Sequence, residues 1–131
     1  MKKIVGLLLV LIVSINGYCD CFKAKAFTYK DQNKNWQEWK KCNIPFCIEN
    51  GTITMYYDSS TRHYTVYDAN VLPRTDKGEL TTYLYYCVDS DGIKCTVKLR
   101  FYNDPDDGSW QAQMYIIYNN LIVLYDITPD I

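Results

Sequence analysis

The sequence is poor in several features on which common protein functions depend. It has a single histidine, His63, and a net charge of only −1. One histidine leaves a serine or cysteine triad a single candidate base, and the apparent strand around His63 favours a surface or cross-strand position instead. No G-x-S-x-G, H-E-x-x-H or phosphate-binding glycine motif occurs. Without a basic surplus or basic run, we expect no nucleic-acid partner and no anionic membrane surface.

Cysteine is absent before Cys19, whereas all six cysteines of the chain follow from there. The segment without cysteine begins with Lys2 and Lys3 and continues with an apolar run over residues 4–15. This order, followed by a small glycine, predicts a secretory signal peptide at 1–17. The run is too short to cross a bilayer as a helix, which takes about 20 residues. We therefore expect a secreted or periplasmic protein with no transmembrane segment.

A lipid anchor at Cys19 is the alternative export route for a bacterial host. The residue before a lipidated cysteine is normally small, but Tyr18 stands there in this chain. Soluble export is therefore favoured. Residues 18–131 then form a single β-rich exported domain, long enough for one core and too short for two.

Long helical periodicity is also missing. The best helical stretch, residues 31–41 with Trp36 and Trp39 three apart, is short and equally suits a loop. Elsewhere short alternating runs rich in tyrosine are separated by glycine, proline and aspartate, a pattern typical of strands. We predict an all-β fold of about eight to ten strands, an antiparallel meander that closes into a small barrel or sandwich.

The segment 42–48 illustrates the strand pattern. Cys42, Ile44, Phe46 and Ile48 share one face of a strand with period two. Pro45 has no N–H to donate, so we expect an edge strand or a proline at an unpaired position. The following Asn-Gly pair predicts a tight turn.

A second hairpin is predicted around Gly92, which suits the left-handed position of a three-residue loop. That register makes Cys87 and Cys95 direct cross-strand neighbours, and we predict a disulfide between them. Further on, Asn119 and Asn120 suggest a type I′ turn, because asparagine tolerates positive φ.

The remaining four cysteines leave the connectivity open. In one extended strand Cys42 and Cys47 are too far apart to bond, so we favour bridges from Cys19 and Cys21 to these two, in either pairing. A turn at residues 43–45 would permit Cys42–Cys47 instead, and free buried thiols are the alternative to disulfides altogether. No C-x-x-C occurs, which argues against zinc.

Acidic residues gather in two turns. Asp89 and Asp91 lie in one, and Asp104, Asp106 and Asp107 in the other. Aspartate is favoured in turns for its local hydrogen bonds, so solvated acidic turns are the preferred interpretation over a calcium site. A pair of acids facing each other across a cleft would instead indicate a glycoside hydrolase.

Aromatic residues are the feature that most suggests recognition. Tyrosine and tryptophan combine an apolar body with a polar tip and are common at binding surfaces. The neighbours Tyr56–Tyr57 and Tyr85–Tyr86 place one ring on each sheet face. The residues we assign to an outward aromatic binding surface are Trp36, Trp39, Trp110, Tyr56 and Tyr85.

Several segments together resemble a family. These are Trp36-x-x-Trp39, the strand Ile53-Thr54-Met55-Tyr56, the run Tyr86-Cys87-Val88-Asp89-x-x-Gly92-x-Lys94-Cys95, and the closing strands around residues 115–118 and 123–126. Together they resemble short, uncharacterised exported β-rich proteins of Bacteroidetes-type bacteria. The resemblance implies a β-rich domain in a bacterial envelope setting. It carries over no activity and no functional residue.

From these observations we expect an exported, non-enzymatic binding or interaction module whose partner is a protein, a glycan or a small ligand. We assign no catalytic, cofactor-binding or metal-binding residue. The alternatives are a small carboxylate-dependent glycoside hydrolase and a structural protein of the cell envelope.

Overall fold

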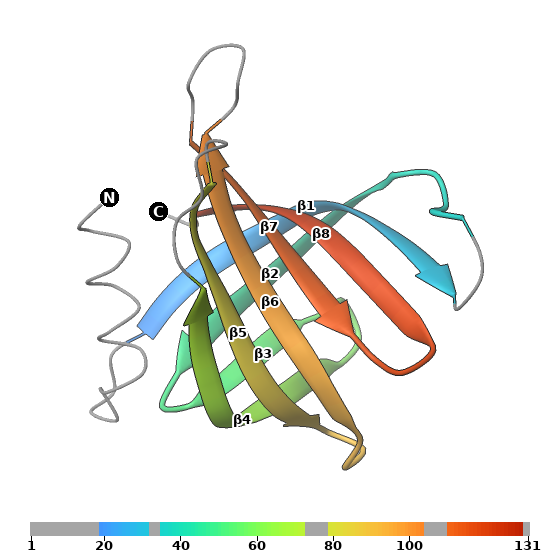
Figure 1. Ribbon diagram of the computed structural model, residues 1–131. Coiled ribbons are helices and arrows are strands. Elements are labelled where there is room, and N and C mark those ends of the chain that lie inside the picture. Colours follow the sequence, from blue (N-terminus) through green and yellow to red (C-terminus); the bar gives the residue numbers. More distant parts are fainter. Residues whose placement is uncertain (1–18, 32–34, 73–78, 104–109, 130–131) are drawn as a thin grey trace.

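The chain folds into a closed barrel of eight antiparallel strands. The computed structural model describes residues 19–31, 35–72, 79–103 and 110–129. The strands follow one another in chain order: β1 (Cys19–Asp31), β2 (Lys40–Glu49), β3 (Thr52–Tyr56), β4 (Thr61–Leu72), β5 (Glu79–Asp89), β6 (Lys94–Asn103), β7 (Trp110–Ile117) and β8 (Leu121–Pro129). Figure 1 shows this meander.

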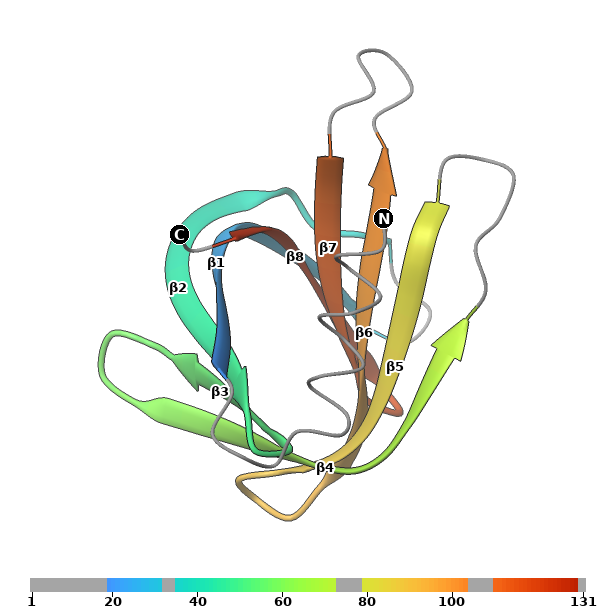
Figure 2. The same cartoon turned by 90° about the vertical axis from the view of Figure 1, so that its left-hand side faces the viewer.

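Each strand pairs with the next, and β8 returns to pair with β1 from Phe22↔Pro129 to Asp31↔Leu121. Figure 2 shows β5, β6 and β7 facing β1 and β2 across the interior. Because the sheet closes on itself, every strand has a neighbouring strand on each side. The predicted all-β meander is confirmed, and of the two predicted forms the barrel is the one adopted.

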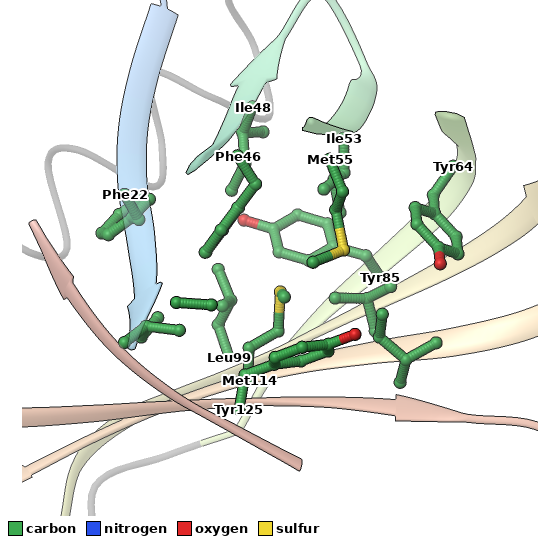
Figure 3. Close-up of a cluster of buried hydrophobic side chains, with 14 of the residues drawn as sticks. Phe22, Phe46, Ile48, Ile53, Met55, Tyr64, Tyr85, Leu99, Met114 and Tyr125 are labelled. Atoms are coloured by element: carbon green, nitrogen blue, oxygen red, sulfur yellow. The ribbon is translucent and has the colours of Figure 1, made fainter. Parts of the chain in front are cut away.

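Alternation along the strands fills the interior with apolar side chains. The labelled residues in Figure 3 come from all eight strands and converge on this core: Phe22, Phe46, Ile48, Ile53, Met55, Tyr64, Tyr85, Leu99, Met114 and Tyr125. An interior of eight strands is just wide enough for side chains, or for one small ligand where they leave room. The position of a residue in its strand therefore decides whether it faces the core.

The β2 strand contains Pro45 without losing a ladder bond to β3. Pro45 lies opposite Lys23 of β1, whereas the ladder between β2 and β3 begins one residue later, at Phe46. Pro45 thus takes the unpaired position that the sequence allowed. The alternative, that β2 is an edge strand, is wrong because β2 pairs with β1 on one side and with β3 on the other.

The turns follow the sequence signals with one exception. Asn50 and Gly51 have φ of 52° and 75°, as a type I′ turn requires, and Gly92 has φ of 81°. Asn119 and Asn120 also form a turn, closed by Tyr118 N–H donating to Leu121 O. Asn50 is the one non-glycine residue with positive φ among those described, so the predicted type I′ geometry at Asn119–Asn120 is wrong.

Residues 35–39 are irregular rather than helical.

One disulfide joins the first two strands. Cys21 and Cys47 are opposite each other in the ladder between β1 and β2, with Cα atoms 4.1 Å apart. Phe22 follows Cys21 and Phe46 precedes Cys47, and both rings face the core. Because side chains alternate along a strand, the disulfide lies on the outer face of the barrel. It fits one of the bridges predicted from the N-terminal cysteines.

The predicted disulfide between Cys87 and Cys95 is not present, although its predicted register is. The two residues are direct partners in the ladder between β5 and β6, and both thiols are free and buried. Asp89 N–H donates to Ile93 O, which makes Asp89–Ile93 a hydrogen-bonded pair. By alternation Cys87–Cys95 is also of this wider type, with Cα atoms about 5.5 Å apart. The Cβ atoms of a hydrogen-bonded pair lie toward the wide end of about 4.5–5.5 Å, whereas a disulfide holds its two Cβ atoms about 3.5–4.5 Å apart.

The thiol of Cys42 is also free, so the predicted bridge from Cys42 to the N-terminal cysteines is wrong. It lies by the irregularity in β1 between Ala24 and Ala26, several residues along the ladder from Cys21. There its Sγ–H donates to Ala24 O at 3.5 Å. The side chain of Cys19 lies outside the described part of the structure.

Over the described residues, no helix has the length and apolar character needed to cross a membrane. The Cys21–Cys47 disulfide indicates a non-reducing environment.

Candidate functional site

A cavity of about 380 Å³ lies at the end of the barrel where the β3–β4, β5–β6 and β7–β8 turns meet. We call it the mouth cavity. Four tyrosine rings, one arginine and a few apolar side chains line it: Tyr57, Arg62, Tyr64, Asp89, Ile93, Ile116, Tyr118, Asn120, Leu121, Val123 and Tyr125. These residues come from four different strands and three turns, so only the folded barrel brings them together.

Asp89 is the buried centre of the polar side of this cavity. Its Oδ1 accepts the backbone N–H groups of Asp91 and Ile93, each at 2.9 Å. Its Oδ2 accepts a hydrogen bond from Tyr118 Oη and one from Arg62 Nη2, each at 2.7 Å. The carboxylate thus closes the β5–β6 turn and ties it to β4 and β7.

This environment favours the charged form of Asp89. Burial acts to raise the pKa of the carboxyl, but the hydrogen bond from Tyr118, the two backbone N–H groups and the charge of Arg62 outweigh it. The pKa of Asp89 therefore lies below its usual value. Asp89 is ionised at neutral pH and acts as a fixed anion.

Arg62 is the cation of the mouth cavity. It belongs to the inward face of β4 and is one third exposed, with Nη2 2.7 Å from Asp89 Oδ2 and 3.2 Å from Asp91 Oδ2. Its guanidinium also lies 6.0 Å from the centre of the Tyr64 ring. The charge of Arg62 is therefore shared between two carboxylates and an aromatic ring before any ligand arrives.

The tyrosines supply hydroxyl groups, and those of Tyr64, Tyr118 and Tyr125 stay protonated. Tyr57 Oη and Tyr125 Oη are 3.2 Å apart and either can donate to the other. Burial raises the pKa of Tyr118 to about 12 and raises the pKa of Tyr64 and Tyr125 as well. The mouth cavity thus presents neutral hydroxyl groups as donors and acceptors across the ordinary pH range.

The arrangement is suited to holding a ligand rather than to acid–base chemistry. The two acids at the mouth, Asp89 and Asp91, belong to the same turn and share one arginine instead of facing each other across a gap. Asp89 already accepts four hydrogen bonds. In the part of the chain that is described, no three histidine, cysteine or acidic residues gather as a metal site would require.

The residues assigned from sequence to an aromatic surface differ in their exposure. Trp36, Trp39 and Tyr56 are exposed, at 41%, 50% and 46% of their surface. The ring–ring contacts found among the described residues join Phe22 to Phe46, Phe27 to Tyr125 and Tyr83 to Phe101, and involve none of these three.

Tyr85 was assigned to the same surface, and this prediction is wrong. The ring is only 3% exposed because Tyr85 shares the inward face of β5 with Cys87, while Tyr86 takes the outward face. The side chain of Trp110 lies outside the described residues.

Sequence reasoning missed the residues that line the mouth cavity. Tyr64 lies on the inward face of β4, and the same alternation puts Arg62 there too. A charged residue at an inward position near the end of a strand is unusual, and this was the signal available. The alternation along β4 could not identify Asp89 as the partner of Arg62, because the two residues are 27 positions apart in the sequence.

A second cavity of about 330 Å³ opens near the β2–β3 turn. It is lined by Ile48, Gly51, Val66, Tyr67, Asp68, Ala69 and Tyr85. Its lining contains no arginine and no ion pair like the one between Arg62 and Asp89, and we therefore regard the mouth cavity as the stronger site.

Comparison with known proteins adds no functional assignment: no family model, curated protein or solved structure matches this chain.

Proposed function

We propose that this protein is an exported, non-enzymatic binding module, and that the mouth cavity is its ligand site. The observation that carries the proposal is a space of about 380 Å³ bounded by four tyrosine rings and a fixed Arg62–Asp89 pair. Small-molecule sites are typically concave, about 300–1,000 Å³, with apolar walls and a few well-placed polar groups. The mouth cavity has this composition and lies at the small end of that range.

Rigid walls further support a binding role. The Arg62–Asp89–Tyr118 network fixes three side chains, from β4, β5 and the β7–β8 turn, by hydrogen bonds of 2.7 Å. A site whose side chains are already held loses less conformational entropy when a ligand binds. The leader pattern at residues 1–17 and the Cys21–Cys47 disulfide support export.

The proposal is tested by filling the cavity. Leu121 lines the mouth at the start of β8, and Leu121→Trp places a large ring there. A library of small uncharged compounds is screened against wild type by ligand-observed NMR. We expect hits on wild type that lose at least tenfold in affinity on the Leu121→Trp variant.

The matched control is Val71→Trp. Val71 is exposed on β4 and lines neither cavity, so the same ring added there should leave binding unchanged. Hits that bind Leu121→Trp as well as wild type, or no hits at all, would contradict a ligand site at the mouth.

A further inference from the structure

We infer that the mouth cavity selects an uncharged ligand bearing a ring and a hydroxyl group over its anionic analogue, and that Asp91 sets the discrimination against anions. This inference rests on the proposed function and specifies the ligand class of the same site.

The preference for a ring follows from the walls. The rings of Tyr57, Tyr64, Tyr118 and Tyr125 line the cavity together with the apolar side chains of Ile93, Ile116, Leu121 and Val123. Aromatic pairs in stacked or edge-to-face contact are stabilised beyond what their buried area supplies. A flat ring can use this surface more fully than a flexible chain.

The preference for a hydroxyl group follows from the polar atoms that remain available to a ligand. Tyr57 Oη and Tyr125 Oη face each other at 3.2 Å, and either can be the donor. A hydroxyl has one donor and two acceptor sites, so a ligand hydroxyl can extend this pair in either direction. Asn120 at the rim offers a further amide.

The charges at the mouth disfavour an anion. An anion would be drawn to Arg62, but Nη2 of Arg62 already contacts Asp89 at 2.7 Å and Asp91 at 3.2 Å. Asp91 is 64% exposed and so meets an approaching anion with its own negative charge. The two carboxylates outnumber the one guanidinium, so the local net charge is negative.

The experiment compares two probes of nearly the same size, benzyl alcohol and benzoate. Dissociation constants are measured for the full folded chain by protein-observed NMR titration at low salt. We expect benzyl alcohol to bind at least threefold more tightly than benzoate. Benzoate that binds as tightly as the alcohol would overturn the inference while leaving the proposed function intact.

Asp91→Asn then tests the role of that carboxylate. One unit charge about 4 Å away is worth roughly 1 kcal/mol in water, which is about fivefold in affinity. We expect the variant to bind benzoate about fivefold more tightly, with benzyl alcohol unchanged and the gain lost at high salt.

The matched control is Glu49→Gln, which removes the same charge from an exposed position on β2 next to the opposite turn. It should leave both affinities unchanged. If Asp91→Asn behaves like Glu49→Gln, Asp91 has no part in selectivity. If neither probe binds but other library compounds do, the ligand class is wrong; if nothing binds, the proposed function fails.

Discussion

At the scale of single residues, the decisive feature is a buried ion held by many donors. Asp89 accepts hydrogen bonds from two backbone N–H groups, from Tyr118 and from Arg62. A buried carboxylate is stable only when its charge is matched and its oxygens are satisfied. Asp89 meets both conditions, so the same residue stabilises the turn and fixes one wall of the mouth cavity.

Asp89→Asn is predicted to lower the free energy of unfolding by about 3 kcal/mol at pH 7, since it leaves the partly buried Arg62 without its nearest counter-charge. The pKa of Asp89 is lower in the folded protein than in the unfolded chain. The ionised carboxylate therefore stabilises the fold fully above the unfolded-state pKa, and this stabilisation is lost as the pH falls through the folded-state pKa. The difference between wild type and variant should therefore shrink below about pH 4. Urea unfolding of both proteins at several pH values measures this difference in the free energy of unfolding.

Asp91→Asn serves as the control for that series, because Asp91 is mostly exposed and its carboxylate contributes little to stability. A stability gap between wild type and Asp89→Asn that stays constant from neutral to acid pH would show that Asp89 does not carry this dependence.

The thiols provide a second prediction at this scale. Burial raises the pKa of Cys87 to about 12 and also raises the pKa of Cys95 and Cys42. These groups are poor nucleophiles in the folded protein. Alkylation after denaturation without reductant should label Cys42, Cys87 and Cys95, whereas Cys21 and Cys47 should require reduction.

Peptide mapping by mass spectrometry reads this pattern. If Cys87 and Cys95 become labelled only after reduction, they are bonded to each other and the hydrogen-bonded spacing does not prevent it. If Cys21 is labelled without reduction, the disulfide between β1 and β2 is absent.

At the scale of elements, local sequence rules account for the strands and most turns. Alternation over residues 42–48 predicts which side chains face the core, and Asn50–Gly51 predicts a turn that the structure confirms. Local rules cannot find the mouth cavity, because Tyr57 and Tyr125 are 68 residues apart in sequence. They also cannot tell a hydrogen-bonded pair from the narrower kind, so they predict a disulfide at Cys87–Cys95 that the structure lacks.

The disulfide between the first two strands should be a main support of the barrel. The Cys21–Cys47 bond closes a loop with a sequence separation of 26 residues, and a loop of this size corresponds to about 3 kcal/mol of stability. The double variant Cys21→Ser with Cys47→Ser should lose about this amount in denaturant unfolding. Reductant should lower the stability of wild type and leave the variant unchanged; equal responses would contradict the prediction.

The glycines of the two tight turns are held in backbone conformations that other residues resist. Gly51 and Gly92 have φ of 75° and 81°, and a Cβ at either position would meet no atom within 4 Å. Gly51→Ala and Gly92→Ala should therefore each cost about 1–2 kcal/mol from backbone strain alone. Thermal unfolding measures the loss.

Ser59→Ala, in the exposed β3–β4 turn, is the matched control and should stay within about 0.5 kcal/mol of wild type. If the glycine variants are as stable as this control, the positive φ values of the two turns are wrong.

At the scale of the whole molecule, the complete barrel forms the candidate site. The antiparallel meander brings the start of β8 and the start of β4 to the same end of the molecule, and closure arranges them around one mouth. Eight strands leave an interior that is mostly filled by side chains, and the unfilled space at the mouth is bounded by tyrosines and one ion pair. The proposed binding role therefore rests on a property of the complete fold and on no single motif.

The most direct test of this account is to map where a ligand binds. Isotope-labelled protein is titrated with benzyl alcohol, and the amide and tyrosine ring signals are followed. The account predicts that the largest shifts fall on residues of the mouth cavity such as Tyr57, Arg62 and Tyr118. Shifts concentrated instead on Trp36 and Trp39, or none at saturating probe, would contradict it.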